Sequence, residues 1–160
     1  MIDWMTLSSL VLGLASALVA GVFMTFSDFV MAGLARAPAA AGIAAMQALN
    51  RTVYRSVFLS TFMAIVPLSV IFAAAAVLTI GGATAACAVA ASAVYLATVF
   101  AVTAARNVPM NQRLDAMDAD SQTAAAYWLT YSVSWTRWNH VRTIGATVTA
   151  ALYLILVATP

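Results

Sequence analysis

The sequence has few charged residues, and they are of only two kinds. It contains no lysine and no glutamate, and its seven arginines and five aspartates make up 8% of 160 residues. Soluble domains carry about 25% charged residues, so this chain could not cover a surface in contact with water. With 64% hydrophobic residues, it is predicted to be an integral membrane protein. A net charge of +2 is too small for counterion-driven binding to nucleic acid.

Cysteine and histidine occur once each, as Cys87 and His140. A single cysteine excludes a disulfide within the chain. A single histidine excludes bis-histidine haem and a histidine-rich dinuclear centre within one chain. We therefore predict no metal site, although a mononuclear metal held by His140 with Asn or Asp oxygens stays open.

Long apolar runs are abundant, and a membrane-spanning helix needs about 20 apolar residues. Gly81-Gly82 divides the longest uncharged stretch into a tight helical hairpin. The pattern predicts an all-α fold, a single transmembrane domain over residues 1–160 that forms an up-down four-helix bundle. The predicted spans are 7–27, 56–80, 84–105 and 141–158.

The arginines predict the orientation of this bundle. All seven lie around the connections between the first and second spans and between the third and fourth. The positive-inside rule places these connections in the cytoplasm and both termini outside.

Two stretches outside the spans also have helical spacing. Residues 38–55 contain Gly42, but neither glycine nor proline stands directly before the second span. Residues 121–140 continue into the fourth span in the same way. We expect both to continue those helices beyond the bilayer on the cytoplasmic side, with Asp118 or Asp120 capping the fourth helix. The expected partner of the chain is the lipid bilayer. Small residues on the first helix permit close contact with another helix, so a homo-oligomer is also an open alternative.

Polar and aromatic residues gather at the cytoplasmic end of the fourth helix. At about 100° per residue, one face carries six of them. An interfacial aromatic belt explains the tryptophans, but it does not explain an amide and a guanidinium on the same face. The alternative is a ligand pocket lined by this face, which comprises Trp128, Tyr131, Trp135, Trp138, Asn139 and Arg142.

A second polar group follows the third span. Pro109 disfavours a helical conformation at Val108, so a break or kink is expected there. Asn107 and Asn111 stand on either side of it. They could cap the broken helix, line a pocket, or do both.

Three further residues have a structural and a functional interpretation. Met46 and Asn50 are one turn apart, and Asn50 needs a partner if buried, either across a helix interface or on a ligand. Asp28 could pair with an arginine or titrate in a pocket. Phe26 and its neighbours could wall a planar ligand or belong to the core.

Several of these residues carry a family resemblance. The segment Asn107-Val108-Pro109-Met110-Asn111, then Trp128, then residues 135–142 (Trp-Thr-Arg-Trp-Asn-His-Val-Arg) resemble the signature of the anthrone oxygenase family of small membrane proteins. Residues 30–34 and 46–50 also resemble its pattern, with Ala32 where a proline is expected. The resemblance covers essentially the whole chain.

The resemblance implies a four-span membrane fold and a possible role in oxidising an anthrone to a quinone with dioxygen as co-substrate, without an organic cofactor. It also implies a small aromatic or quinone-like ligand, and the composition suggests a bacterial inner membrane. On this hypothesis His140 is the base, and Trp128, Trp135 and Trp138 stack on the ring. The oxyanion is held by Arg142, Asn139, Asn107 and Asn111.

Tyr131, Asn50, Met46, Asp28 and Phe26 complete the expected site. The alternative is a non-enzymatic membrane module that binds a quinone, a lipid or a partner subunit. A closed pocket containing the polar residues would favour the enzyme, and their exposure to lipid would favour the module.

Overall fold

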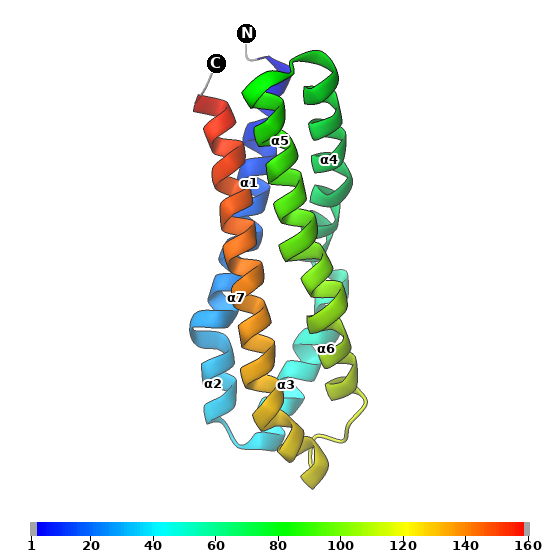
Figure 1. Ribbon diagram of the computed structural model, residues 1–160. Helices are drawn as coiled ribbons and strands as arrows, with labels where there is room; N and C mark the ends of the chain where they lie inside the picture. The colour runs from blue at the N-terminus through cyan, green and yellow to red at the C-terminus, as the bar shows by residue number, and fades with distance from the viewer. Residues whose placement is uncertain (1–2, 159–160) are drawn as a thin grey trace.

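The computed structural model describes residues 3–158 as four long helices, each antiparallel to the next in the chain (Figure 1). Each helix is long and apolar enough to cross a membrane, which confirms the predicted all-α membrane bundle. The four predicted spans correspond to these helices one for one. The helices are Trp4–Arg36, Val57–Thr79, Gly82–Asp115 and Gln122–Ala158.

Two of these helices are composite. The first consists of α1 (Trp4–Thr25), the π-helical segment η1 (Phe26–Val30) and α2 (Met31–Arg36). The third consists of α5 (Gly82–Val94), the π-helical segments η3 (Tyr95–Phe100) and η4 (Thr103–Asn107), and α6 (Val108–Asp115). Between the first and the third long helices, the chain forms α3 (Ala39–Thr52), the 3₁₀ turn η2 (Val53–Arg55) and α4 (Val57–Thr79). Of these, α4 is the second long helix.

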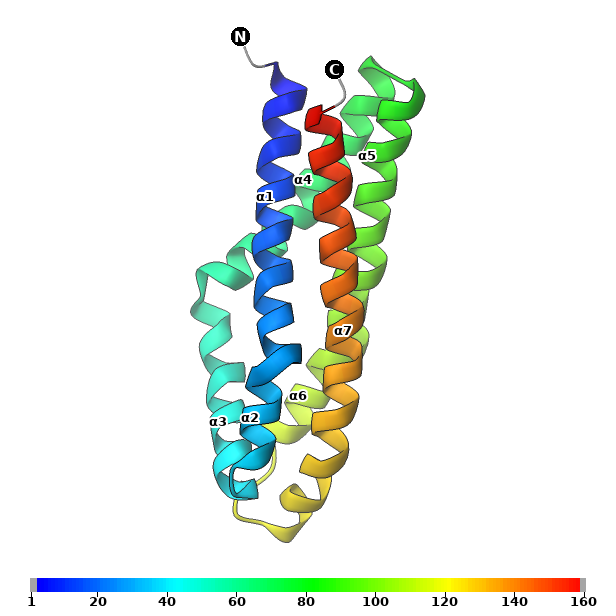
Figure 2. The same ribbon diagram turned by 90° about the vertical axis from the view of Figure 1, so that its left-hand side faces the viewer.

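The fourth helix, α7 (Gln122–Ala158), has 37 residues and runs the full height of the molecule (Figure 1). It packs against α1 and α5, and α4 completes the ring between α5 and α1. The described chain ends lie at the same end of the bundle as the Gly81-Gly82 turn, which we call the terminal end (Figures 1 and 2). Both glycines have positive φ, 73° and 60°, as the predicted tight turn requires.

The expectation of an unbroken extension of the second helix is wrong. The helix of α3 ends in η2, and Ser56 is extended, with φ −95° and ψ 150°. Ser56 then begins α4 as its N-cap, because its Oγ accepts a hydrogen bond from the amide of Leu59 at 3.1 Å. The chain changes direction here without glycine or proline, so no sequence signal marks the break. In contrast, α7 is one continuous helix from Gln122 to Ala158.

The expected break at Val108 does not occur. Val108 is helical, with φ −61° and ψ −48°, and Pro109 lies in the first turn of α6. The preceding turn is π-helical, a geometry with one extra residue per turn that removes the need for a regular hydrogen bond at proline. The first and third long helices also extend beyond their predicted spans, to Arg36 and to Asp115.

The helix caps differ in one case from expectation. Ser121, and not Asp118 or Asp120, caps α7, since its Oγ accepts a hydrogen bond from the amide of Ala124 at 3.1 Å. At the start of α1, Asp3 accepts from the Thr6 amide at 2.7 Å, and this hydrogen bond lowers the pKa of the Asp3 carboxyl.

Two buried clusters fill the bundle. The terminal-end core is made of small and aromatic side chains of α1, α4, α5 and α7, including Ala76, Ala88 and Ala91. The connection-end core, at the opposite end, contains Met31, Ile43, Met46, Leu114, Ala124, Trp128, Tyr131 and Trp135. The site described below lies where these two cores meet.

Candidate functional site

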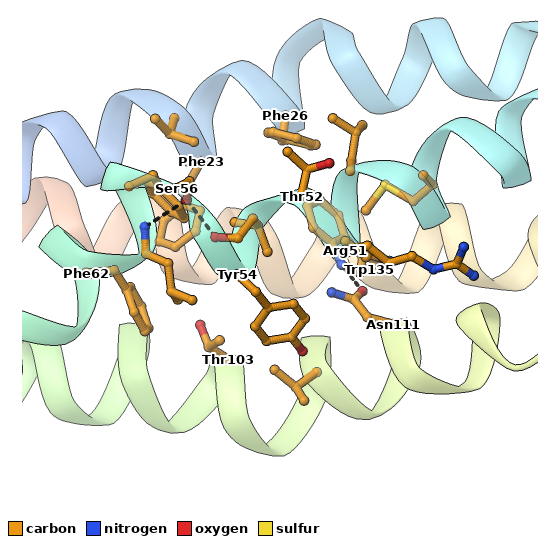
Figure 3. A pocket seen from close by; sticks show the side chains of 18 of the residues that line it. Phe23, Phe26, Arg51, Thr52, Tyr54, Ser56, Phe62, Thr103, Asn111 and Trp135 are labelled. Atoms are coloured by element: carbon orange, nitrogen blue, oxygen red, sulfur yellow. Dashed lines mark hydrogen bonds between the residues drawn. The ribbon is translucent and has the colours of Figure 1, made fainter.

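A pocket of about 360 Å³ lies between η1, the α3–α4 junction, the Gly82–Asp115 helix and α7 (Figure 3). This volume is at the lower end of the range of small-molecule sites. Its lining residues are Val22, Phe23, Phe26, Met46, Leu49, Asn50, Arg51, Thr52, Val53, Tyr54, Ser56, Phe58, Leu59, Phe62, Thr103, Val108, Asn111, Gln112, Asp115, Trp135 and Arg142.

The pocket lies where the helices depart from regular geometry. One wall comes from the residues around η2, and Thr103 of η4 and Phe26 of η1 contribute to two others. A π-helical turn rotates the following side chains relative to a regular helix, and such turns are frequent at functional sites. The break at Ser56 displaces α3 from the axis of α4 (Figure 2), which leaves space between them and α7.

Aromatic rings form the walls of this pocket. The ring of Phe23 packs edge-on against those of Phe58 and Phe62, with centroids 5.5 and 6.3 Å away. Phe26 packs against Trp135 at 5.7 Å. Figure 3 shows these rings on several sides of the cavity. Walls of this kind suit a flat apolar ligand.

Arg142 supplies a buried positive charge at the pocket. Its side chain is 5% exposed, and its guanidinium carbon lies 4.3 Å from the Phe23 ring centroid and 5.1 Å from that of Trp135. Nη1 donates to Thr103 Oγ1 at 3.3 Å. Within residues 3–158, the ion pair found joins Arg51 to Asp115, and no carboxylate pairs with Arg142.

Asn139 holds this guanidinium in place. It is fully buried, and its Oδ1 accepts from Arg142 Nη2 at 2.6 Å. Its Nδ2 donates to the carbonyl of Phe23 at 2.6 Å and to Ser27 Oγ at 2.5 Å. The amide therefore connects α7 to the first helix where η1 begins, and fixes the guanidinium relative to the Phe23 wall.

A second polar cluster lies toward the connection end. Asn111 Oδ1 accepts hydrogen bonds from the Trp135 indole at 2.8 Å and from the Tyr131 hydroxyl at 2.9 Å. Figure 3 shows the Asn111 amide between Trp135 and the cavity. Both donors are on α7, so one amide of α6 orients Trp135 of the wall and Tyr131 of the connection-end core.

The exposed side of the pocket, which we call the mouth, is lined by Arg51, Thr52, Tyr54, Gln112 and Asp115. Arg51 Nε donates to Asp115 Oδ1 at 2.8 Å, with side chains 64% and 37% exposed. Tyr54 is 67% exposed and lies between the α3–α4 junction and the Gly82–Asp115 helix (Figure 3). The backbone of η2 does not pack against η4 or α6, so only side chains close the mouth of the pocket.

The structure brings together six of the residues predicted for the site. They line the pocket, with Asn139 directly behind Arg142. These six are Phe26, Met46, Asn50, Asn111, Trp135 and Arg142.

The other predicted site residues do not line the pocket. His140 and Asp28 are exposed. Trp128 stacks on Tyr131 with centroids 5.5 Å apart, both inside the connection-end core. Trp138 lies beneath the Arg106 guanidinium, whose carbon is 4.8 Å from the ring centroid. Asn107 is buried and donates to the carbonyl of Trp135 at 3.3 Å.

Several pocket residues were not predicted from the sequence. Three of them, Phe58, Phe62 and Thr103, lie in segments whose sequence predicts a uniformly apolar helix. The fourth, Tyr54, lies just before such a segment. Their role depends on the break at Ser56 and on the π-helical turn at Thr103, and neither has a signal in the sequence.

In chemical terms, the pocket suits a planar aromatic anion. Its walls are aromatic, and a buried guanidinium without a counter-ion stabilises negative charge strongly in a place of low dielectric. Among residues 3–158, no group of three or more His, Cys, Asp or Glu side chains could hold a metal ion.

The sequence model of the family described as anthrone oxygenase matches residues 50–152, which include most of the pocket. Comparison with curated proteins and with solved structures gives no match.

Proposed function

The chain belongs to the anthrone oxygenase family, and from this premise we propose that it is a membrane oxygenase that oxidises a planar phenolic compound of the anthrone type to a quinone. Dioxygen is the co-substrate, and no organic cofactor takes part. The observation that carries the proposal is the buried Arg142 guanidinium, which faces an aromatic pocket and has no carboxylate partner within the described residues.

The chemistry requires an anionic intermediate. Loss of a proton from the anthrone methylene gives a carbanion whose charge is delocalised onto the ring oxygen. This anion gives one electron to dioxygen, and the resulting radical and superoxide combine into a peroxide anion, which takes up a proton to become a hydroperoxide. Loss of water then leaves the carbonyl, so that one oxygen atom enters the quinone and the other leaves as water.

Arg142 stabilises the anion in this scheme. A guanidinium beside the ring oxygen favours the deprotonated form of the substrate and therefore eases removal of the methylene proton. The hydrogen bond between Asn139 and Arg142, 2.6 Å long, keeps the charge in position before the substrate binds. The rings of Phe23, Phe26 and Trp135 hold the substrate flat and exclude water.

The proton leaves through the mouth. Asp115 is the only carboxylate among the pocket-lining residues, and we assign to it the transfer of the proton to solvent. We do not assign this role to His140, because its side chain is exposed and outside the pocket.

The proposed setting is the inner membrane of a bacterium, with the mouth on the cytoplasmic side. The arginines that flank the connections support this orientation through the positive-inside rule. An apolar substrate would then reach the mouth from the bilayer.

Oxygen uptake by the purified protein with anthrone as substrate tests the proposal. We expect Arg142→Gln to lower kcat/KM by about 100-fold or more, as for loss of an oxyanion donor. The matched control is Arg137→Gln, an exposed arginine on the same helix, which should keep the wild-type rate. Anthraquinone formation is measured in parallel, and autoxidation is subtracted with protein-free samples.

A pocket-filling variant covers the case in which Arg142→Gln does not fold. Leu59→Trp places a large ring in the pocket at a residue that makes no hydrogen bond to Arg142, and it should also abolish turnover. If folded Arg142→Gln and Leu59→Trp proteins both keep the wild-type rate, the proposed function is wrong. Binding of anthraquinone without any turnover would instead favour a non-enzymatic quinone-binding module.

A further inference from the structure

Two buried hydrogen-bond donors of the pocket have no acceptor. They are Nε of Arg142 and Nδ2 of Asn50. Buried donors in native proteins are almost always satisfied, so an orphan donor that faces a cavity indicates an acceptor supplied by a ligand or by water. Other orphan polar atoms of the described residues, such as those of Ser9 and Tyr153, do not line the pocket.

The two donors belong to different parts of the pocket. Arg142 comes from α7 and lies between the rings of Phe23 and Trp135. Asn50 comes from the last turns of α3, and its side-chain amide lies within reach of the Tyr131 hydroxyl oxygen, whose own proton is donated to Asn111. Because the amide carries two N–H donors, at least one of them stays available to a ligand. A ligand with two acceptor atoms could satisfy both donors.

We propose that the pocket recognises a planar ring system through two oxygen atoms, one bound by Arg142 and the other by Asn50. The ligand class is an aromatic para-quinone together with its phenolic precursor. This rests on the proposed function, in which Arg142 binds the ring oxygen already present and Asn50 binds the oxygen that the reaction introduces. Asn50 is then the residue that distinguishes the doubly oxygenated ring from the singly oxygenated one.

A series of three ligands on one frame tests the assignment. Anthracene, anthrone and anthraquinone share three fused rings and carry no, one and two ring oxygens. Binding to the full-length protein in detergent is followed by quenching of tryptophan fluorescence, since Trp135 lines the pocket. Oxygen is excluded so that anthrone is not oxidised. Affinity should rise at each step, by roughly threefold to tenfold for the second oxygen.

The decisive variant is Asn50→Leu, which keeps the branched shape of the side chain and removes the donor. It should abolish the rise in affinity from anthrone to anthraquinone and keep the rise from anthracene to anthrone. The matched control is Gln47→Leu, because Gln47 lies on the same helix and donates to the carbonyls of Leu114 and Met117 outside the pocket. It should keep both steps.

Two results would overturn the assignment. If folded Asn50→Leu protein keeps the anthrone-to-anthraquinone step, Asn50 does not bind the second oxygen. If Tyr131→Phe abolishes that step as fully as Asn50→Leu does, the Tyr131 hydroxyl is the group that binds the second oxygen of the ligand. Because the series measures binding without turnover, it can succeed while oxygen uptake fails, and the two proposals can be rejected separately.

Discussion

The two ends of the bundle are built from different side chains and different helix geometry. At the terminal end, α4 and α5 are regular helices, and alanines such as Ala76 and Ala88 are fully buried between them and their neighbours. Around the pocket, π-helical and 3₁₀ segments interrupt the helices, and buried amides and a guanidinium replace alanine.

This difference shows how a short membrane protein separates stability from chemistry. Small side chains let helices approach closely and keep the terminal end well packed. Irregular turns elsewhere free space and backbone carbonyls, and polar side chains use both. Asn139, for example, reaches the carbonyl of Phe23 next to η1. Variants at the terminal end should therefore affect stability alone, and variants of the polar network around the pocket should affect binding as well.

Asn139 is the position where the two properties should fail together, and the largest effect is expected there. Asn139→Leu removes three hydrogen bonds and leaves Arg142 held only by Thr103. The free energy of unfolding should fall by more than about 3 kcal/mol, and ligand binding should be lost. Thermal unfolding in detergent and fluorescence quenching check the two parts. Retained binding with full affinity would contradict a positioning role for this amide.

Gly145 tests close packing between α7 and the third helix. A Cβ at this position would lie 1.8 Å from Thr98 Oγ1, so Gly145→Ala should lower the unfolding free energy by about 1–3 kcal/mol through overpacking. Gly21→Ala is the matched control, since nothing lies within 4 Å of a Cβ there. Equal melting temperatures for the two variants would show that the helices adjust without strain.

Asn111 tests whether the aromatic wall depends on one amide. Asn111→Leu leaves the Trp135 indole and the Tyr131 hydroxyl without their shared acceptor. We expect a loss of about 1–3 kcal/mol in unfolding free energy and a weaker affinity for anthraquinone, because Trp135 is no longer fixed. The affinity is compared with that of a folded Thr130→Val variant, whose hydroxyl bonds only within its own helix.

The smallest effect on stability is expected at the mouth. Arg51 and Asp115 form an exposed pair, which should contribute less than about 1 kcal/mol. Arg51→Gln should therefore leave the melting temperature nearly unchanged, in both low and high salt. A large loss of stability would indicate that the mouth is held closed by this pair.

Some of the site followed from helical periodicity alone. The spacing of Trp135, Asn139 and Arg142 places them on one face of any straight helix, and α7 is straight and continuous enough to keep that register. The same rule does not show which flank faces solvent, and His140 proved to be on the exposed side. A local rule also misled at Pro109, because a π-helical turn accommodated the proline without a break.

The sequence by itself determined the membrane class, the four apolar helices, the Gly81-Gly82 turn and the polar face of α7. These follow from composition, run length and spacing, which are local properties of the chain. Only the tertiary structure decided that the chain breaks at Ser56, that Phe58, Phe62 and Thr103 line one pocket with Arg142, and that Asn50 faces it. These features depend on how four helices share the space between them, and no single segment contains that information.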